Sequence, residues 1–506
     1  MTADKIFSVD QIHEADRYTI DHEPIKSVDL MERAATACSG WIRNKPFKPF
    51  VIHVFCGLGN NGGDGLAIAR LLLEEGYTVN VYIVRYSEKC SNDFLSNELA
   101  LKELAIYKIA NIFTEENIPL IEQKDVIIDA LIGTGLSKPT DGMLAKVIEK
   151  INLSKAPIIS IDIASGLFAD QHSDPESCIV KPTFTLCFQF PKAAFFFPEN
   201  ESYVGEFVIL DIGLHPDFIK KEPAKNYFLT ETFIRSLIKP RRKFAHKGNF
   251  GHALIISGTE GKMGAAVLTA KSSLRSGVGL LTVQVPGCGY LILQSTVPEA
   301  MVISDLNTRC ITESHYSDCY NAIGIGPGIG TADETGLVLE KLLRSAVRPV
   351  VLDADALNIL SLHKDWVALI PKHSILTPHI KEFERLTQKA ENDFERNRLQ
   401  IEFSQINQVY VILKGAHTCI STPDGHCYFN SNGNPGMAKG GSGDSLTGIL
   451  TSLLAQSYTP LETAMIGVYI HGLAGDFAKA DKGEIGMTAS DIIDHLPQAF
   501  LKVSHL

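Results

Sequence analysis

The sequence contains no C-x-x-C pair, although it has ten cysteines among its 506 residues. They are scattered between Cys38 and Cys427, without the close spacings that cysteine and histidine pairs use to hold zinc. In a chain of this length such scattered cysteines are typical of buried thiols in a reducing compartment. We therefore predict free, buried thiols and a chemistry that does not use zinc.

Long apolar runs and an excess of positive charge are also missing. The N-terminal stretch MTADKIFSVDQIHEADRY has no apolar segment of the kind found in secretory signals, and no run approaches the roughly 18 apolar residues of a membrane span. Lysine and arginine number 47 against 58 acidic residues, a net charge of −11. An acidic balance disfavours nonspecific binding of nucleic acid. We predict a cytoplasmic enzyme without a membrane or nucleic-acid partner.

The sequence does contain regular α/β alternation. Domains usually hold about 100–200 residues, which predicts two or three of them here. A capping box at Ser8 and Gln11 predicts a first helix, and a second helical pattern covers about 28–43. Helical stretches then separate short apolar runs, so we predict a parallel sheet. The expected strands lie near 51–55, 77–84, 125–131, 157–163, 183–190 and 206–211.

A polar stretch over about 214–243 interrupts this pattern, and we place a domain boundary near 225. A second alternation follows, with helices expected over 264–277 and 443–456. The predicted domains are thus 1–225 and 226–506, both of the α/β class. The later strands are expected within 252–258, 279–286, 321–328, 348–354, 373–379 and 408–417.

The first candidate site is the string NNGGDG, residues 60–65, which follows an apolar run. Gly57, Gly59 and Gly62 satisfy G-x-G-x-x-G, but the acidic residue that a hydride-carrying dinucleotide fold needs further on is replaced by Arg85. The string instead predicts free N–H groups at a helix N-terminus, where an anion can bind. A tight turn capped by asparagine and aspartate is the simpler alternative.

Two further predicted strands end in similar features. One ends at Asp129 and is followed by the glycine loop 133–135; the other ends at Asp162, with Ser165 just beyond it. Ligands of open α/β sheets bind beyond the carboxyl ends of the strands, so all three strand ends point to one crevice. Asp162 alone could also cap a helix.

NNGGDG, DALIGTGL and IDIASGL together resemble the NAD(P)HX epimerase family over about residues 5–215, although Ala164 replaces a common proline or valine. The resemblance implies a Rossmann-like three-layer α/β/α domain and a K⁺ ion on Asn61, Asp129 and Ser165, whose oxygens suit a weakly hydrated cation. It implies that Asp162 is the acid–base group that acts at C6 of the hydrated nicotinamide. The implied nucleotide contacts are Asn60, Asn61, Gly62, Gly63, Asp64, Gly133, Thr134, Gly135, Leu136, Ser137, Lys138, Pro139 and Asp162.

The second half carries the string NGNPGMAKGGSGDSLTGILTSLL, residues 432–454. Gly440, Gly441 and Gly443 open a predicted helix whose free N–H groups can face a phosphate, and Asp444 stands at the same helix end. An anion site beside a carboxylate base is what phosphoryl transfer to a hydroxyl requires. A capped helix after a glycine-rich loop is the simpler alternative. The earlier GTEGK lacks the spacing of a P-loop.

This string, with HKGNFGHALIISG, GKMGAA, GIGPGIG, LDADALN, LTPH and LKGAHT, resembles the ribokinase-like ADP/ATP-dependent NAD(P)HX dehydratases over about residues 230–500. The resemblance implies Asp444 as the catalytic base and Mg²⁺ bound with ADP or ATP, with ADP favoured because fused members typically use it. It implies nucleotide contacts at Lys414, Gly415, Ala416, His417, Thr418 and Gly443, and hydrated-dinucleotide contacts at Ala265, Gly328, His379 and Asp444.

The predicted function is therefore repair of hydrated NADH and NADPH. The first domain would interconvert the R and S epimers, and the second would dehydrate the S form. Two alternatives stay open: a sugar or vitamin kinase in the second half, and a first half that only binds nicotinamide nucleotides or a protein partner. We also expect a homo-oligomer, which no motif here specifies.

Overall fold

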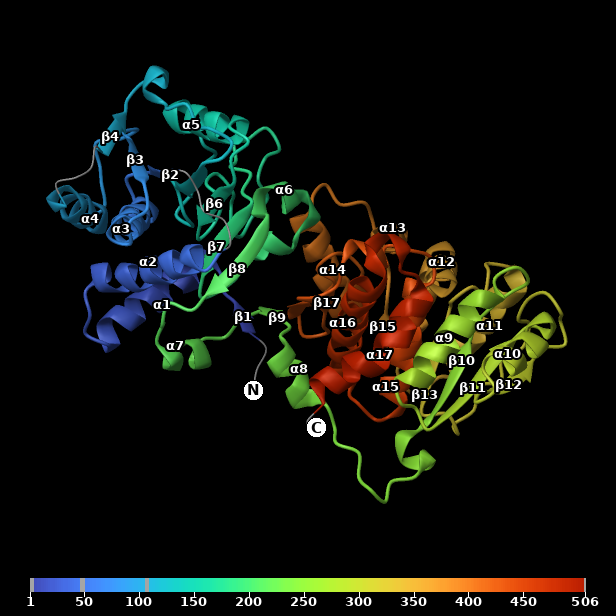
Figure 1. Cartoon of the computed structure of the whole chain (residues 1–506). Coiled ribbons are helices and arrows are strands. Elements are labelled where there is room, and N and C mark those ends of the chain that lie inside the picture. The colour runs from blue at the N-terminus through green and yellow to red at the C-terminus, as the bar shows by residue number, and fades with distance from the viewer. Residues whose placement is uncertain (1–3, 46–50, 105–108, 505–506) are drawn as a thin grey trace. The chain divides into compact units, whose positions relative to one another are not determined.

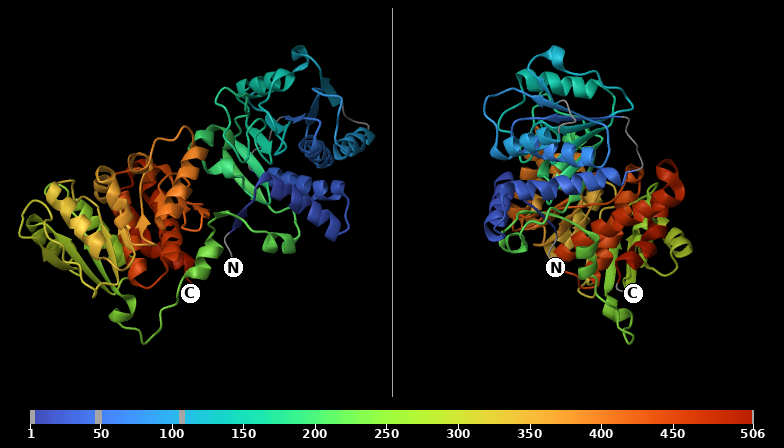
Figure 2. Two further views of the ribbon diagram at one scale, coloured as in Figure 1. Left: turned by 180° about the vertical axis from the view of Figure 1, so that it is seen from behind. Right: turned by 60° about the vertical axis from the view of Figure 1, so that its left-hand side comes forward.

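The computed structural model describes residues 4–45, 51–104 and 109–504 and divides the chain into two compact units. The first unit is Lys5–Ala224 and the second continues from Lys225, with the first residue of β1 (Asp4–Ile6) assigned to the second (Figures 1 and 2). In the part of the chain that is described, no helix combines the length and the apolar character needed to cross a membrane.

The first unit is built on a parallel sheet with the strand order β4-β3-β2-β5-β6-β7-β8, which confirms the predicted parallel arrangement. Helix α3 packs on β2, β3 and β5, and α5 covers the other face of the sheet (Figure 1). The strands are β2 (Ile52–Cys56), β3 (Val79–Val84), β4 (Ile109–Ile112), β5 (Val126–Ala130), β6 (Ile158–Ile161), β7 (Phe184–Phe188) and β8 (Glu206–Leu210). The helices are α1 (Val9–His22), α2 (Ser27–Arg43), α3 (Asn60–Glu74), α4 (Asn92–Glu103), α5 (Gly142–Leu153), α6 (Glu201–Val204) and α7 (Pro216–Lys221).

The apolar runs predicted as strands in this half all form strands, with ends shifted by a few residues. Such strands can be predicted from the sequence because central parallel strands are covered on both faces and are therefore continuously apolar. Every residue of β2 and β5 is buried. The capping box also forms as predicted, since Ser8 accepts the N–H of Gln11 and begins α1.

The second unit contains a larger mixed sheet in the order β9-β18-β17-β16-β15-β14-β13-β10-β11-β12, with antiparallel pairing only at β16-β17 and β17-β18 among these strands. The strands are β9 (Asn226–Phe228), β10 (His252–Ile256), β11 (Leu280–Val285), β12 (Met301–Ser304), β13 (Ala322–Ile325), β14 (Val350–Leu352), β15 (Ile375–Leu376), β16 (Tyr410–Leu413), β17 (Cys419–Ser421) and β18 (Cys427–Phe429). The helices are α8 (Glu231–Leu237), α9 (Met263–Arg275), α10 (Tyr290–Thr296), α11 (Asp333–Ser345), α12 (Asp355–Leu362), α13 (Ile380–Leu386), α14 (Asp393–Asn407), α15 (Ser442–Ala455), α16 (Pro460–Gly486) and α17 (Ala489–Val503).

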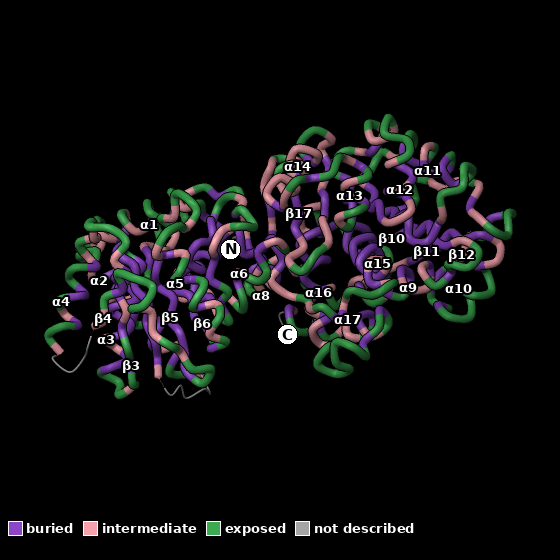
Figure 3. The backbone as a smooth tube through the Cα atoms, turned by 90° about the horizontal axis from the view of Figure 1, so that it is seen from above, coloured by how far each residue is buried: buried purple, intermediate pink, exposed green. Residues whose placement is uncertain are grey.

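Side chains alternate along these strands between two apolar cores. Ala253 and Ile255 of β10 pack in the core that includes α9, α15, α16 and α17, whereas Leu254 and Ile256 pack in the core of α11, α12 and α13. Figure 3 shows the buried residues gathered on the strands. Helices therefore cover both faces of this sheet as well.

The cysteines only partly follow the prediction. All ten are free, and five of them are buried: Cys38, Cys56, Cys187, Cys419 and Cys427. Of the others, Cys319 is exposed and the remaining four are partly exposed. Spacing alone could not separate the two groups, because burial depends on the tertiary fold.

Candidate active sites

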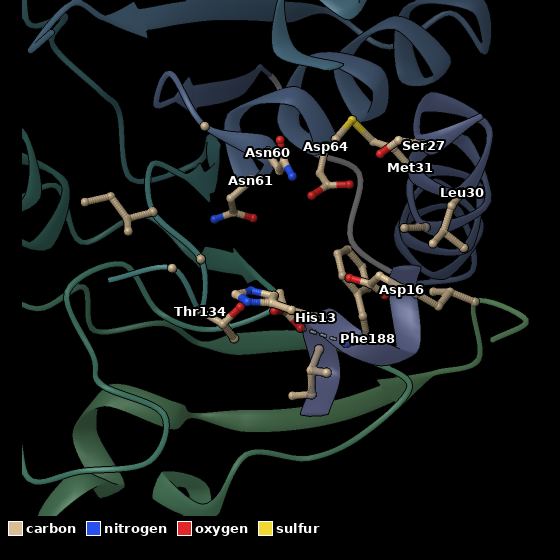
Figure 4. Close-up of a pocket in the computed structure, with 18 of the residues that line it drawn as sticks. His13, Asp16, Ser27, Leu30, Met31, Asn60, Asn61, Asp64, Thr134 and Phe188 are labelled. Carbon is tan, nitrogen blue, oxygen red and sulfur yellow. Dashed lines mark hydrogen bonds between the residues drawn. The ribbon is translucent and has the colours of Figure 1, made fainter. Parts of the chain in front are cut away.

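A cavity of about 610 Å³ opens in the first unit, beyond the carboxyl ends of β2, β5 and β6 (Figure 4). The strand order reverses between β2 and β5, and this is where open α/β sheets bind their ligands. Figure 4 shows Asn60, Asn61 and Asp64 on one side and His13, Asp16 and Thr134 on the other. The predicted residues that line the cavity are Asn60, Asn61, Asp64, Gly133, Thr134, Gly135 and Asp162.

NNGGDG forms the first turns of α3, so the alternative of a simple tight turn is wrong. The N-cap is Gly59, and no side chain caps the helix. The first N–H groups of α3 therefore keep their capacity to bind an anion. A Cβ on Gly62 would lie 2.0 Å from the Gly57 carbonyl oxygen, and one on Gly63 would lie 2.9 Å from the Met31 sulfur. Both glycines permit the close packing of the helix start.

Hydrogen bonds at Asp129 join the ends of β5 and β6. This fully buried carboxylate accepts the Ser165 hydroxyl (2.5 Å) and N–H (3.0 Å), the Ser160 hydroxyl (2.7 Å) and the Leu131 N–H (3.3 Å). The Ser165 hydroxyl in turn accepts the Ile132 N–H at 2.9 Å. Burial raises the pKa of Asp129, and these donors oppose the rise. Two of the three predicted cation ligands are thus in direct contact.

Asn61, in α3, lies between the end of β6 and the loop 133–135. One orientation of its amide donates to the Ile161 carbonyl and accepts the Gly133 N–H, both at 3.2 Å. This orientation satisfies both the donor and the acceptor group of the amide. Amide, carbonyl and hydroxyl oxygens beside one buried carboxylate are the donor set that K⁺ accepts. The residues therefore fit such an ion.

Asp162 follows β6 in a left-handed backbone conformation, with φ +66°. It caps no helix, because residues 162–183 contain none, and the helix-cap alternative is therefore wrong. Its Oδ1 accepts the Phe188 N–H at 3.1 Å and is paired with the Lys192 ammonium, whose side chain is only 1% exposed. Within the described residues Oδ2 has no hydrogen bond, which leaves it available to a ligand in the cavity.

Lys192 is the partner that sequence reasoning missed. Burial lowers its pKa, but Asp162 and Cys187 raise it more, and the net shift is upward. Its Nζ also lies 3.2 Å from Cys187 Sγ and 3.2 Å from the Phe190 carbonyl oxygen. It is therefore a fixed positive charge behind Asp162.

The second unit places Asp444 in the first turn of α15. The N-cap is Gly441, with φ +91°, a conformation in which a β-carbon would be strained. No hydrogen bond or ion pair of Asp444 exists among the described residues. Burial raises its pKa to about 6, helped by the charge of Asp353 and opposed by Lys414. Such a carboxyl suits proton transfer near neutral pH.

A partly buried ion pair lies close to Asp444. Asp353, 1% exposed, accepts the Lys414 ammonium at 2.9 Å and the Thr447 hydroxyl of α15 at 2.7 Å. A Cβ on Gly443 would lie 3.3 Å from Lys414 Nζ, so this lysine runs close under the helix start. The pair joins the end of β14, the end of β16 and α15.

His379 lies beside Lys414, since the two form an isolated parallel bridge. It caps α13: its side chain accepts the Glu382 N–H at 3.3 Å, and its own N–H donates to the Glu382 carboxylate at 2.9 Å. Burial lowers the pKa of His379 and outweighs the opposing charge of Glu382. His379 is therefore both a helix cap and a neighbour of the predicted nucleotide loop.

The remaining predicted residues of this unit form two local groups. Gly328, with φ +65°, packs so closely on Ala265 that its Cβ would lie 2.9 Å from the Ala265 Cβ. In the loop after β16, the Thr418 hydroxyl donates to the Gly415 carbonyl at 3.1 Å, and His417 contacts the Asn430 carbonyl at 3.0 Å. Ala416 is exposed in that loop.

Comparison with known proteins identifies the relationship. Residues 27–194 match the family described as YjeF-related protein N-terminus, and residues 253–498 match NAD(P)H-hydrate dehydratase. The bifunctional NAD(P)H-hydrate repair enzyme of Thermofilum pendens is 33% identical over 98% of this chain and 96% of its own. The chain belongs to this family. The Escherichia coli member is 32% identical over 97% of this chain and 93% of its own.

Solved structures match the second unit of this family member. A ribokinase-like superfamily protein from Enterococcus faecalis has a TM-score of 0.50 and 28% identity, over 56% of this chain and 98% of its own. The ADP/ATP-dependent NAD(P)H-hydrate dehydratase of Bacillus subtilis, co-crystallised with ATP and Mg²⁺, has a TM-score of 0.49 and 29% identity, over 55% and 98%. The ribokinase-like fold predicted for the second half is confirmed.

Several residues predicted from the repair-enzyme motifs lie outside the cavity of the first unit. Leu136, Ser137, Lys138 and Pro139 do not line it, and Lys138 instead forms an exposed ion pair with Asp141. Gly62 and Gly63 serve the packing of α3. Contact of these residues with a nucleotide therefore remains a prediction.

Other cavity residues were not singled out from the sequence. His13, Asp16 and Arg17 line the cavity from α1, and Met31 and Tyr86 line it from other elements. The spacing of His13, Asp16 and Arg17 places them on one helix face. That pattern is also typical of an ordinary solvent-exposed face, so it gave no specific signal.

Proposed function

We propose that the first unit epimerises the R and S forms of NADHX and NADPHX, and that the second dehydrates the S form at the expense of ADP or ATP. The observation that carries the proposal is the presence of two sites in one chain: a cavity at the strand-order reversal, and Asp444 without a hydrogen bond at a glycine-opened helix start. Membership of the bifunctional family supports the pairing of these two reactions.

In the first unit the substrate would carry a hydroxyl at C6 of the nicotinamide ring. The N–H groups at the start of α3 would bind its phosphates, with Asn60, Asp64 and Thr134 lining the cavity beside them. Asp162 would act as the acid–base group through Oδ2, while Lys192 and the Phe188 N–H hold Oδ1 in place. Loss and return of a substituent at C6 through a flattened intermediate would interconvert the epimers.

K⁺ would be held by Asn61, Asp129 and Ser165, with the Ile161 carbonyl beside them. When bound, it would supply positive charge next to the 133–135 loop. These residues would then fix the loop that lines the cavity.

In the second unit Asp444 would take the proton of the substrate hydroxyl as phosphoryl transfer begins, and the N–H groups around Gly441 and Gly443 would hold the developing negative charge. This transfer gives AMP from ADP or ADP from ATP. Phosphate then leaves readily from C6 while C5 loses a proton to water, which restores the C5=C6 double bond. Lys414 to Thr418 would contact the nucleotide. Mg²⁺ usually binds through one or two carboxylates and the phosphates, and Asp353 and Glu382 are the carboxylates beside Lys414.

The deciding experiment follows the near-ultraviolet absorbance of NADH in a mixture of R- and S-NADHX, with K⁺, Mg²⁺ and either ADP or ATP. Full recovery of NADH is expected, and the faster nucleotide identifies the donor. Recovery of only the S fraction would remove the epimerase assignment. Absence of recovery with either nucleotide would favour a kinase of another small molecule, to be tested by transfer of label from ATP to a stable phosphorylated product.

The alternative of a first unit that only binds nucleotides predicts that Asp162→Asn leaves both binding and epimerisation unchanged. A cytoplasmic location and a homo-oligomeric state stay predictions, as does the preference between NADHX and NADPHX.

A further inference from the structure

Epimerisation at a hydrated carbon needs proton transfer on both faces of the ring. A hydroxyl must leave from one face and return on the other, and each event requires a donor or an acceptor within hydrogen-bond reach. Asp162 can serve one face only. The cavity should therefore contain a second titratable group that comes from a different element.

Asp16 meets this requirement. It lines the cavity from α1, whereas Asp162 lines it from the end of β6, and Figure 4 shows Asp16 across the cavity from Asp64. It is partly buried and has no hydrogen bond or ion pair within the described residues. A half-buried carboxyl with no structural partner contributes nothing evident to the fold. Its position is explained if a ligand supplies the partner.

The charges around Asp16 keep it ready to exchange a proton. Burial, helped by the charge of Asp162 and opposed by Lys192, raises its pKa to about 6. Asp64 faces the same space from α3, and His13 and Arg17 lie on the same face of α1. Lys192 pairs directly with Asp162 and not with Asp16. The two carboxyls thus have different environments, which is how acid and base roles are separated within one site.

We propose that Asp16 is a second catalytic carboxyl of the first unit, acting on the face of the nicotinamide C6 opposite to Asp162. The inference rests on the epimerase function proposed above. Asp16 belongs to none of the sequence motifs. Its role depends on the position of α1, which forms one wall of the cavity.

Neutral Asp16 donates its proton to the C6 hydroxyl, the C6–O bond breaks with its electron pair on the departing water, and the N1 lone pair forms a C6=N1 iminium. A water molecule then attacks C6 from the other face, the iminium electrons return to N1, and the Asp162 carboxylate takes the proton of the attacking water. The reverse direction uses neutral Asp162 as donor and the Asp16 carboxylate as acceptor.

The test uses the full-length enzyme and the variant Asp16→Asn. Conversion of R-NADHX to the S form is expected to fall about 10²–10⁴-fold in kcat, with little change in KM, because an acid–base group and not a binding group is removed. Dehydration of purified S-NADHX by the same preparation should be unchanged. Asp21→Asn is the matched control, since Asp21 lies on the same helix but is exposed and outside the cavity.

Two further readouts separate catalysis from a structural role. Asp16→Glu should recover part of the activity, and wild-type epimerisation in ¹⁸O-labelled water should place ¹⁸O at C6 of the product. An epimerisation rate for Asp16→Asn within tenfold of wild type would overturn the proposal, as would an effect on KM alone. Retention of the original C6 oxygen would overturn the exchange of the hydroxyl with water. If the wild-type enzyme does not epimerise at all, the proposed function itself fails.

Discussion

Both units set a lysine against a carboxylate near the start of a glycine-opened helix, but they place the pair differently. In the first unit Lys192 pairs with Asp162, the carboxylate that lines the cavity. In the second, Lys414 pairs with Asp353, and Asp444 at the helix start has no such partner. The same type of ion pair therefore holds the reacting group in one unit and lies behind it in the other.

This difference has an electrostatic consequence. A lysine in direct contact fixes the orientation of its carboxylate through a charge-assisted hydrogen bond. In the second unit the lysine pairs with Asp353 and does not contact Asp444. Burial and the charge of Asp353 therefore raise the pKa of Asp444 to about 6. One site thus favours orientation, and the other favours proton affinity.

The largest effect should follow Asp444→Asn, which removes the only base proposed for the second unit. Dehydration of S-NADHX should fall about 10²–10⁴-fold or more, since general-base catalysis contributes that much. Epimerisation should be unchanged, because Asp444 lies in a different unit from the cavity. Both rates are measured on one preparation, and a parallel loss of the two would contradict the separation of the sites.

Replacing the two lysines would compare the pairs directly. Lys192→Met leaves Asp162 without its cation in a buried site, and breaking a buried pair costs about 3–5 kcal/mol. Lys414→Met should cost less, because the Lys414 side chain is 23% exposed against 1% for Lys192. Urea unfolding, followed by a spectroscopic signal that does not depend on activity, gives the free energies. A greater cost for Lys414→Met would reverse the comparison.

The raised pKa of Asp444 predicts a shifted pH profile. A base works only when ionised, so kcat/KM for dehydration should fall as the pH drops through about 6, well above the range of an ordinary aspartate. Asp353→Asn removes a charge that raises this pKa, so the acid limb should move to lower pH. Asp365→Asn, at an exposed position, is the control. An acid limb that stays in place would show that Asp353 does not act on Asp444.

Removal of K⁺ should have the smallest effect and should act on one unit only. Loss of about 1.4 kcal/mol of transition-state stabilisation would slow epimerisation tenfold. Dehydration of S-NADHX should be unaffected if the second unit has no need of the ion. Assays in K⁺-free buffer with a large organic cation as the replacement salt decide this, and an unaltered epimerisation rate would count against Asn61, Asp129 and Ser165 as ligands.

The sequence specifies most of the fold because buried parallel strands appear as apolar runs. The ends of β2 and β5 were predicted to within one residue on that basis. Strands β9, β17 and β18 have three residues each, too few to show an alternation of apolar and polar residues, and they were not predicted. Their pairing depends on segments far away in the sequence.

The candidate sites likewise contain some residues that the sequence predicted and others that only the structure shows. Motifs at strand ends were found because topology gathers the carboxyl ends of parallel strands at one edge. Asp16 and Lys192 were not predicted. The sequence of α1 is typical of an ordinary amphipathic helix, and a lysine in a loop is usually exposed. Asp353 stands in a recognised motif, yet only the structure shows its contacts with Lys414 and Thr447.

The left-handed backbone at Asp162 restricts which residues can occupy that position. An L-residue with a β-carbon pays roughly 1–2 kcal/mol for this conformation, and aspartate and asparagine tolerate it better than others because their short side chains bond locally. Alanine would change backbone energy and chemistry together, whereas asparagine changes the charge alone. The backbone therefore disfavours most other residues at this position by a modest amount, independently of what the enzyme is selected to do.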